Sequence, residues 1–403
     1  MRPAPSAPSK ANRLAPSRLA LGFLAAASLM APAASYAADM SDAMSTHAMN
    51  ADAAPMDHAA TDHGAMAMPP LPASVTWAMM APAGGFMFNY TPTFMGMGTN
   101  YIGTTKVSPE TIVTTIPSGQ THTMMMMGKS VTMPTMLRIV PTSMDAQMHM
   151  FNVMYGLTKD VTLMASGGYV GKTMSMTSYS GMMGATVLGS STGSTDGLAD
   201  TMVGAAYRAY QDNIHHLQFS ISFSLPTGSQ TRQVQMLSPM TGMLMTMRAP
   251  YAMQSGTGTF DFVPAVAYTG MLDKWSWGLG YKARIALDNN SEGYHYGDLH
   301  EFHGWAGYSL FPWLTPTFHV IGTTQDHIQG SDALITGLSQ TANPLYYGGQ
   351  RVTLLGGVVM NGAPLGYRNA SLAVEAGAPV YQNLNGPQLG QNWQLTLSAR
   401  AMF

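Results

Sequence analysis

Apolar and polar side chains alternate one by one along much of this chain, in short segments separated by turn residues. The pattern is clearest over residues 217–225 and 275–287. A period of two is typical of β-strands that present one apolar face and one polar or small face. About twelve such segments follow Gly84, so the sequence predicts an all-β fold.

The connections between these segments alternate between short and long. Tight turns are expected at residues 158–160, 211–213, 272–274 and 311–313, and a slightly longer one at 361–369. Long connections are expected at about 91–145, 177–198, 226–258, 288–298, 326–349 and 379–391. Outer-membrane barrels have short periplasmic turns and longer extracellular loops. The order therefore predicts an antiparallel transmembrane β-barrel of about 12 strands, with both chain ends on the periplasmic side.

A soluble double-sheet fold is the alternative, because it also buries one face of each strand and shows the same period. In residues 275–287, the face opposite the large apolar side chains carries small or charged residues: Ser276, Gly278, Gly280, Lys282, Arg284 and Ala286. Such a face suits a crowded lumen better than a water-facing sheet. Charged residues are also only 9% of the chain, where about 25% is usual for soluble domains. Both observations favour the barrel.

The two ends of the chain carry signals of export. Basic residues precede an apolar run at residues 19–30, and small residues follow up to Ala37, which is the order of a signal peptide over residues 1–37. The alternative, a membrane-anchoring helix, needs roughly 20 apolar residues. At the far end, residues 392–403 alternate and stop on Phe403, and such an end resembles the signal that barrels present to their assembly machinery. We expect a location in the bacterial outer membrane, with lipid and that machinery as partners.

Composition and motifs exclude several other classes of function. A net charge of -2 and a pI near 6.6 give no reason to expect nucleic acid as a partner. Cysteine is absent, which excludes disulfides, thiolate metal sites and a cysteine nucleophile. No H-E-x-x-H or phosphate-binding G-x-x-x-x-G-K-[ST] motif occurs. Asp326 and His327 form an acid–histidine neighbour pair, but such pairs arise easily by chance, and we expect no enzyme.

Charged side chains within the strands are expected to point into the lumen. An Arg or Lys that faces lipid at mid-depth is unfavourable by roughly 2 to 4 kcal/mol. The expected lumen-lining residues are Arg208, Lys282, Arg284, Glu301, His303, His319, Arg351, Glu375 and Arg400. They form either an internal network of ion pairs that fills a narrow barrel or a polar constriction that selects solutes. Twelve strands lie between filled eight-stranded barrels and open porins, so both alternatives stand.

Residues 38–72 are rich in Ala, Met, Asp and His and show no hydrophobic period, so we expect a disordered periplasmic tail before a barrel over residues 73–403. Thioether sulfur selects soft Cu(I), whereas imidazole and carboxylate accept Cu(II). The candidate metal ligands are Met40, Met44, His47, Met49, Met56, His58, His63, Met66 and Met68. The alternative is that Met is a soft packing residue in a tail of drifting composition. The chain has 38 methionines, with a further run at residues 124–127.

Five stretches, all at turns or strand ends, carry a resemblance to a known family. They are residues 148–157 (MHMFNVMYGL), 225–229 (LPTGS), 250–270 (PYAMQSGTGTFDFVPAVAYTG), 275–278 (WSWG) and 375–389 (EAGAPVYQNLNGPQL). Together they resemble a family of outer-membrane transporters grouped with the phenol-degradation meta-pathway barrels, over about residues 84–403. The resemblance implies a barrel that passes small hydrophobic or aromatic molecules. The methionine run at residues 124–127 departs from the family's ordinary first loop.

We therefore expect a passive outer-membrane channel or transporter that requires no cofactor and passes a small, hydrophobic or aromatic solute. The alternative is a protein that sequesters copper or another soft metal with its tail and uses the barrel as an anchor. Deleting residues 38–70 discriminates between the two, because it spares a channel and abolishes sequestration.

Overall fold

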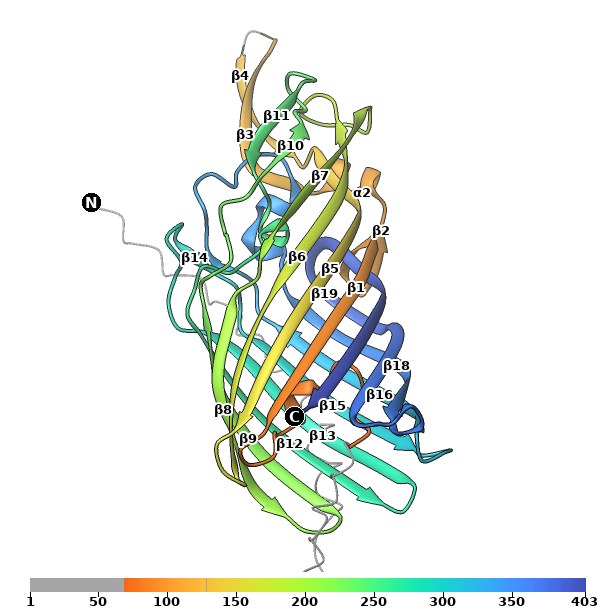
Figure 1. The fold of residues 1–403 in the computed structure, drawn as a ribbon. Coiled ribbons are helices and arrows are strands. Elements are labelled where there is room, and N and C mark those ends of the chain that lie inside the picture. The colour runs from red at the N-terminus through yellow and green to blue at the C-terminus, as the bar shows by residue number, and fades with distance from the viewer. Residues whose placement is uncertain (1–68, 128) are drawn as a thin grey trace, which may run out of the picture. The chain divides into compact units, whose positions relative to one another are not determined.

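The computed structural model describes residues 69–127 and 129–403 and confirms an all-β antiparallel barrel. Its wall consists of eleven strands (Figure 1). They are β1 (Phe86–Gly103), β5 (Ile139–Gly156), β6 (Val161–Tyr179), β8 (Thr201–Gln211), β9 (His215–Leu225), β12 (Asp261–Leu272), β13 (Trp275–Ala286), β15 (Leu299–Tyr308), β16 (Leu314–Gln325), β18 (Gly349–Gly362) and β19 (Tyr367–Met402).

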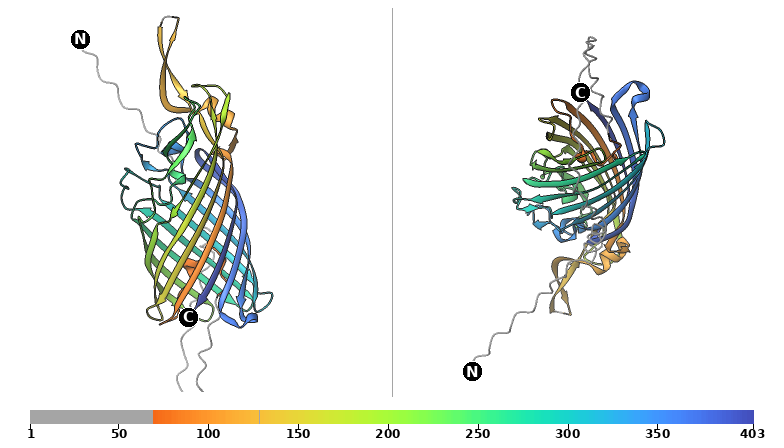
Figure 2. Two further views of the ribbon diagram at one scale, coloured as in Figure 1. Left: turned by 45° about the horizontal axis from the view of Figure 1, so that its top comes forward. Right: turned by 90° about the horizontal axis from the view of Figure 1, so that it is seen from below.

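Each wall strand pairs with its neighbours along the chain, and β19 pairs with β1 to close the ring (Figure 2). β19 is 36 residues long and makes two crossings of the wall. Its residue Leu384 is in register with Gly349 of β18 and with Gly103 of β1, so the strand rises beside β18 and descends beside β1. With this strand counted twice, the barrel has the twelve crossings that the sequence predicts.

The outer surface of the barrel is apolar, and the alternation of the strands sets it. Trp275, Leu279 and Phe318 point outward and are each more than half exposed, whereas Ser276 and Thr317 point inward and are buried. A closed ring with an apolar outer band satisfies every backbone hydrogen bond within the wall, which is what a membrane-spanning sheet requires. The chain is a β-barrel of the bacterial outer membrane.

The short turns all lie at one end, beside the C-terminal end of β19, and the long loops lie at the other (Figure 1). The first end is periplasmic and the second extracellular. The loops contain short strands β2 (Thr105–Val107), β3 (Pro117–Met126), β4 (Lys129–Met136), β7 (Val187–Leu198), β10 (Gln233–Leu237), β11 (Leu244–Arg248), β14 (Tyr294–His295) and β17 (Gln329–Gly330). Their helical turns are α2 (Pro109–Thr115), η2 (Tyr251–Met253), η3 (Gln340–Ala342) and η4 (Pro344–Tyr346), and η5 (Ala363–Leu365) lies in a periplasmic turn. Within the described residues, no helix has the length and apolar character needed to cross a membrane.

The bounds of three long connections predicted from the sequence are wrong. β1 continues to Gly103 rather than ending near residue 91, β7 occupies half of the expected loop at 177–198, and β19 runs through the expected loop at 379–391. Beyond the lipid, the outer face of a strand meets water instead of acyl chains, so the apolar alternation stops while the hydrogen-bonded ladder continues. In β7, for example, Ser, Thr and Gly occupy both faces.

A segment that precedes the first strand lies inside the barrel. Residues 69–83 include the helical turn η1 (Thr76–Ala78), which Figure 2 shows in orange within the ring of strands. Leu71, Val75 and Ala81 of this segment are almost completely buried. The predicted boundary between tail and barrel, between residues 72 and 73, falls within this segment.

The β8–β9 turn is closed by Asp212. Its carboxylate accepts hydrogen bonds from the backbone N–H groups of Ile214 and His215, at 2.8 and 2.6 Å, and from the Tyr210 hydroxyl at 2.8 Å. The N–H of His215, above all, stabilises the charged form and lowers the pKa of Asp212 to about 2. The turn is therefore held by an ionised carboxylate at every physiological pH.

We predict that Asp212→Ala lowers the temperature of thermal unfolding at neutral pH and that this difference vanishes in strong acid. Because the folded-state pKa lies below the ordinary value of about 3.9, the stabilisation is complete above that value and is lost as the pH falls through about 2. Circular-dichroism melting curves in detergent check the prediction. Asp160→Ala is the control, because the exposed Asp160–Lys159 pair contributes little. An Asp212→Ala difference that stays constant down to pH 2 contradicts the prediction.

Candidate functional site: the barrel lumen

The segment of residues 69–83, which we call the plug, is held to the wall by polar groups. Arg400 of β19 donates hydrogen bonds to the carbonyl oxygens of Leu71, Pro72 and Ala73, at 2.9, 2.6 and 3.5 Å. Only 2% of Arg400 is exposed. A buried guanidinium needs several acceptors, and three carbonyl groups of the plug supply them.

A second anchor is a hydrogen-bonded chain from the plug across β19, β16 and β15. The N–H of Ser74 donates to Oε1 of Glu375 at 3.2 Å, and Oε2 of Glu375 lies 3.4 Å from Nδ1 of His319. His303 Nδ1 lies 3.1 Å from His319 Nε2. If His319 donates to the carboxylate, its Nε2 accepts from His303. The chain returns to the plug, because the ring of Trp77 meets His303 edge-on at 5.3 Å.

Further contacts extend along the plug on the other side of the barrel. Gln218 of β9 donates to the carbonyl of Trp77 at 3.1 Å, and the Thr162 hydroxyl of β6 donates to the carbonyl of Ala81 at 3.4 Å. An apolar cluster adds to these bonds, in which Val75 and Met79 of the plug pack among wall residues. Strands on both sides of the lumen therefore hold the plug.

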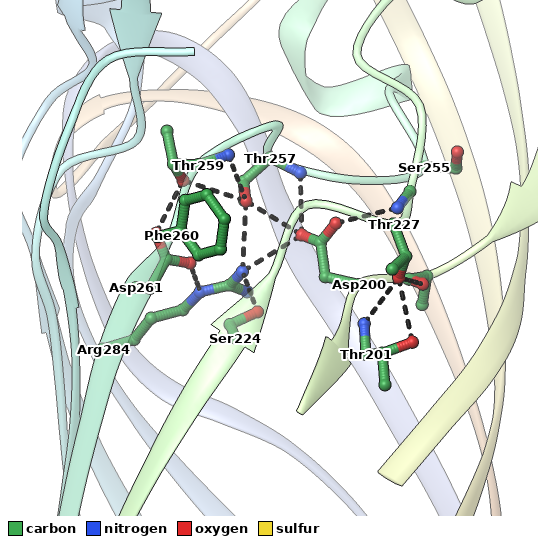
Figure 3. A network of polar contacts seen from close by, with 12 residues as sticks. Asp200, Thr201, Ser224, Thr227, Ser255, Thr257, Thr259, Phe260, Asp261 and Arg284 are labelled. Atoms are coloured by element: carbon green, nitrogen blue, oxygen red, sulfur yellow. Dashed lines mark hydrogen bonds and ion pairs between the residues drawn. The ribbon is translucent and has the colours of Figure 1, made fainter. Parts of the chain in front are cut away.

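Above the plug, a network of charges spans the inner wall near the extracellular end (Figure 3). Arg284 of β13 donates Nε to the Asp261 carboxylate of β12 and Nη2 to the Asp200 carboxylate at 3.2 Å. Asp200, in the break between β7 and β8, also accepts from the N–H groups of Gly228 and Thr257, at 3.0 and 2.8 Å. One guanidinium thus joins three separate parts of the wall.

The nine lumen residues expected from the sequence all lie on inward-facing positions of the wall, in several groups. Glu375, His319, His303 and Arg400 face the plug, and Arg284 belongs to the network above it. Lys282 and Glu301 form an ion pair of 3.0 Å between these groups. The structure places the remaining two apart from the clusters. Arg208 lies near the periplasmic end of β8, and Arg351 of β18 is in register with Thr323 and Gln382.

Several residues of the site were not predicted from the sequence. Asp261 occupies an inward-facing position of β12. It could have been predicted by the rule that predicted Arg284, which is that charged side chains within the strands point into the lumen. Asp200 was not found because it lies beside a segment expected to be a loop. The plug has no charged residue and no alternation of apolar and polar residues. Its only signal in the sequence is that most residues after Pro70 are apolar.

An apolar cavity of about 230 Å³ opens among the extracellular loops. Its lining includes Ile139, Met236, Leu237, Met245 and Met247. The polar residues Gln120, Ser238, Thr336 and Ser339 also line it. For comparison, a cavity of about 150 Å³ lined by Leu, Ile and Phe holds benzene. The chemistry of this cavity therefore suits a small hydrophobic molecule.

The metal ligands expected from the sequence, from Met40 to Met68, all lie outside the described residues. Among residues 69–127 and 129–403, no group of three His, Cys, Asp or Glu side chains is arranged to hold a metal ion. Copper binding by the tail stays a prediction.

Comparison with known proteins gives similar solved structures only. No protein-family model and no curated protein matches this sequence. An outer membrane channel from Pseudomonas putida F1 matches with a TM-score of 0.49 and 16% identity, over 81% of this chain and 98% of that one. The toluene transporter TbuX from Ralstonia pickettii gives 0.35 and 10%, over 80% and 90%, and the P. putida toluene transporter TodX gives 0.36 and 9%, over 82% and 92%.

We predict that Arg284→Met destabilises the barrel strongly. The side chains of Asp200 and Asp261 are 7% and 2% exposed, whereas that of Arg284 is 35% exposed. The loss of one partner of a buried ion pair typically costs about 3 to 5 kcal/mol, and the access of water to Arg284 lowers this cost. The temperature at which unboiled protein loses its folded gel mobility measures the effect. Adding Asp200→Asn and Asp261→Asn should recover most of the stability, because the uncompensated charges are removed. Equal stability of wild type and Arg284→Met would show that the network is structurally neutral.

Proposed function

We propose that this protein is an outer-membrane channel for small hydrophobic solutes and that the plug is its gate. The observation that carries the proposal is the position of residues 69–83 inside the closed ring, bonded to opposite walls. A barrel that served only as an anchor has no need of a separate segment in its lumen. A channel that must not leak does.

The anchors of the plug favour a reversible gate. Five of the six hydrogen bonds described run to main-chain carbonyl groups of the plug, and the sixth runs from a main-chain N–H. Water can replace each of these partners when the plug withdraws, because no charged side chain of the plug is left unpaired. The inner wall then exposes two side chains of opposite charge, Arg400 and Glu375, both on β19.

The class of solute follows from the apolar cavity at the extracellular end and from the family resemblance of the strand ends. The cavity can hold a single aromatic ring, and its methionine side chains adapt to different shapes. We therefore propose monoaromatic or similarly small apolar molecules as cargo, and a relationship to the phenol-degradation meta-pathway barrels. The assembly machinery of the outer membrane is the expected partner during folding.

Deleting residues 69–79 should raise the conductance of the purified barrel in planar bilayers several-fold and speed the entry of a monoaromatic solute into liposomes. The reason is that the deletion removes the segment bonded to Arg400 and Gln218 while the β1 strand keeps its start. Deleting residues 41–66 is the matched control, because it removes a longer stretch and leaves the plug intact.

A variant in which a disulfide bond fixes the plug to the wall gives the opposite test in the same flux experiment. Ala73 packs in one small cluster with Ala373 and Val359, and the chain has no cysteine of its own. An Ala73→Cys/Ala373→Cys variant should lose flux when oxidised and regain it when reduced. If the oxidised variant conducts as well as the reduced one, or the deletion leaves conductance unchanged, the plug is not the gate.

The alternative function, soft-metal sequestration by the tail, leads to its own prediction. Full-length mature protein should bind Cu(I) in competition with a chelator, and replacing the methionines Met40, Met44, Met49, Met56, Met66 and Met68 by Leu should weaken that binding. Binding of Cu(II) to His47, His58 and His63 should weaken as the pH falls through about 6.5. Equal competition by wild type and the Leu variant would exclude the tail methionines as ligands.

A further inference from the structure

Methionine is sorted to one face of the wall formed by β1, β5 and β6. The inward-facing positions of these strands carry ten methionines, three on β1, four on β5 and three on β6. The outward-facing positions of the same three strands carry none, and their large apolar residues are Phe, Tyr, Leu, Val and Ile. On β18, by contrast, Met360 occupies an outward-facing position, so the sorting is a property of β1, β5 and β6.

The register aligns these methionines into two rows across the wall. In the lower row, Met402, Met87, Met154 and Met164 are consecutive cross-strand partners on β19, β1, β5 and β6. Directly opposite residues in a sheet have Cβ atoms about 4.5–5.5 Å apart. Met79 of the plug packs in the same cluster, so five thioethers gather at this place.

The upper row has the same form near the extracellular end. Met97, Met144 and Met174 are consecutive partners on β1, β5 and β6. Methionines of β10, β11 and η2 pack against this row, among them Met236 and Met253. Sheet geometry and loop packing therefore converge on a second group of thioethers.

Methionine also occurs at exposed positions, where its side chain does not contribute to packing. On the β3–β4 hairpin, Met125 is 73% exposed and Met127 is fully exposed. An apolar side chain in water at a loop tip is unfavourable for solubility. A ligand that needs thioethers explains both this tip and the buried rows.

The surroundings of the rows restrict the charge of such a ligand. Arg400 stands two residues before Met402, and Lys172 stands two residues before Met174, both facing the lumen. Each donates to main-chain carbonyl groups. A positive charge beside the thioethers repels a divalent ion about twice as strongly as a monovalent one. The soft monovalent ions are Cu(I) and Ag(I).

We propose that the two methionine rows are binding sites for a soft monovalent cation, Cu(I) or its analogue Ag(I). Thioether sulfur prefers such ions to hard ones. The rows lie at the two ends of the lumen, and Met148 and Met150 of β5 occupy inward positions between them. This inference is independent of the proposed hydrophobic cargo, because it concerns equilibrium binding and not flux.

Silver is the probe, since it is stable in air. Full mature protein is titrated with Ag(I), and the bound metal is counted after desalting. The variant Met87→Leu/Met154→Leu/Met164→Leu should bind about one ion fewer than wild type, and Met97→Leu/Met144→Leu/Met174→Leu should do the same. Leucine keeps the volume and the apolar character, so the fold should survive. The matched control is Met271→Leu/Met360→Leu, at sites outside the two rows, and Zn(II) should not bind the rows.

The methyl groups of the unsubstituted protein give a second readout that does not depend on folding of a variant. With methionine labelled at the methyl carbon, Ag(I) should shift the nuclear magnetic resonance signals of Met87, Met154 and Met164. Undiminished silver binding by both row variants, or unmoved methyl signals at saturation, would overturn the proposal. Loss of binding in the control variant alone would do the same.

Discussion

The constraint on which the structure depends is that lipid offers no hydrogen bonds to a polypeptide backbone. The pairing of β19 with β1 satisfies the last two edges of the sheet at once. Closure also gives every strand an inside and an outside. From that point, a side chain's parity along its strand decides whether it meets lipid or the lumen.

This parity explains how much of the structure could be predicted from the sequence. The alternation in β13 and β9 and the tight turns between strands sufficed for the barrel, its direction and the inward face of Lys282 and Arg284. The extent of β7 could not be predicted, because Ser, Thr and Gly occupy both of its faces and leave no apolar period. The plug could not be predicted either, because its place is set by contacts with residues such as Arg400 and Gln218, far away in the sequence.

The lumen has two chemically different sides. The inner faces of β13, β15, β16 and β19 carry the charged and imidazole side chains that bond to one another and to the plug. The inner faces of β1, β5 and β6 carry thioethers. The plug lies between them: Arg400 and Glu375 of the first side bond to its main chain, and Met79 packs in a cluster with methionines of the second side. The plug is therefore flanked by a polar wall and by a soft, polarisable wall.

The bond between Arg400 and the carbonyl groups of residues 71–73 has a consequence for the order of folding. Arg400 belongs to the last strand, whereas its acceptors immediately precede the first. The guanidinium reaches them only when β19 has taken its place beside β1, so sealing the seam and seating the segment are a single step. A nascent barrel that closes without residues 69–83 inside lacks three acceptors of Arg400, whose Nε keeps Ser398 as its partner, and water must replace them. Seating the plug therefore adds direct hydrogen bonds at the same seam that closes the ring.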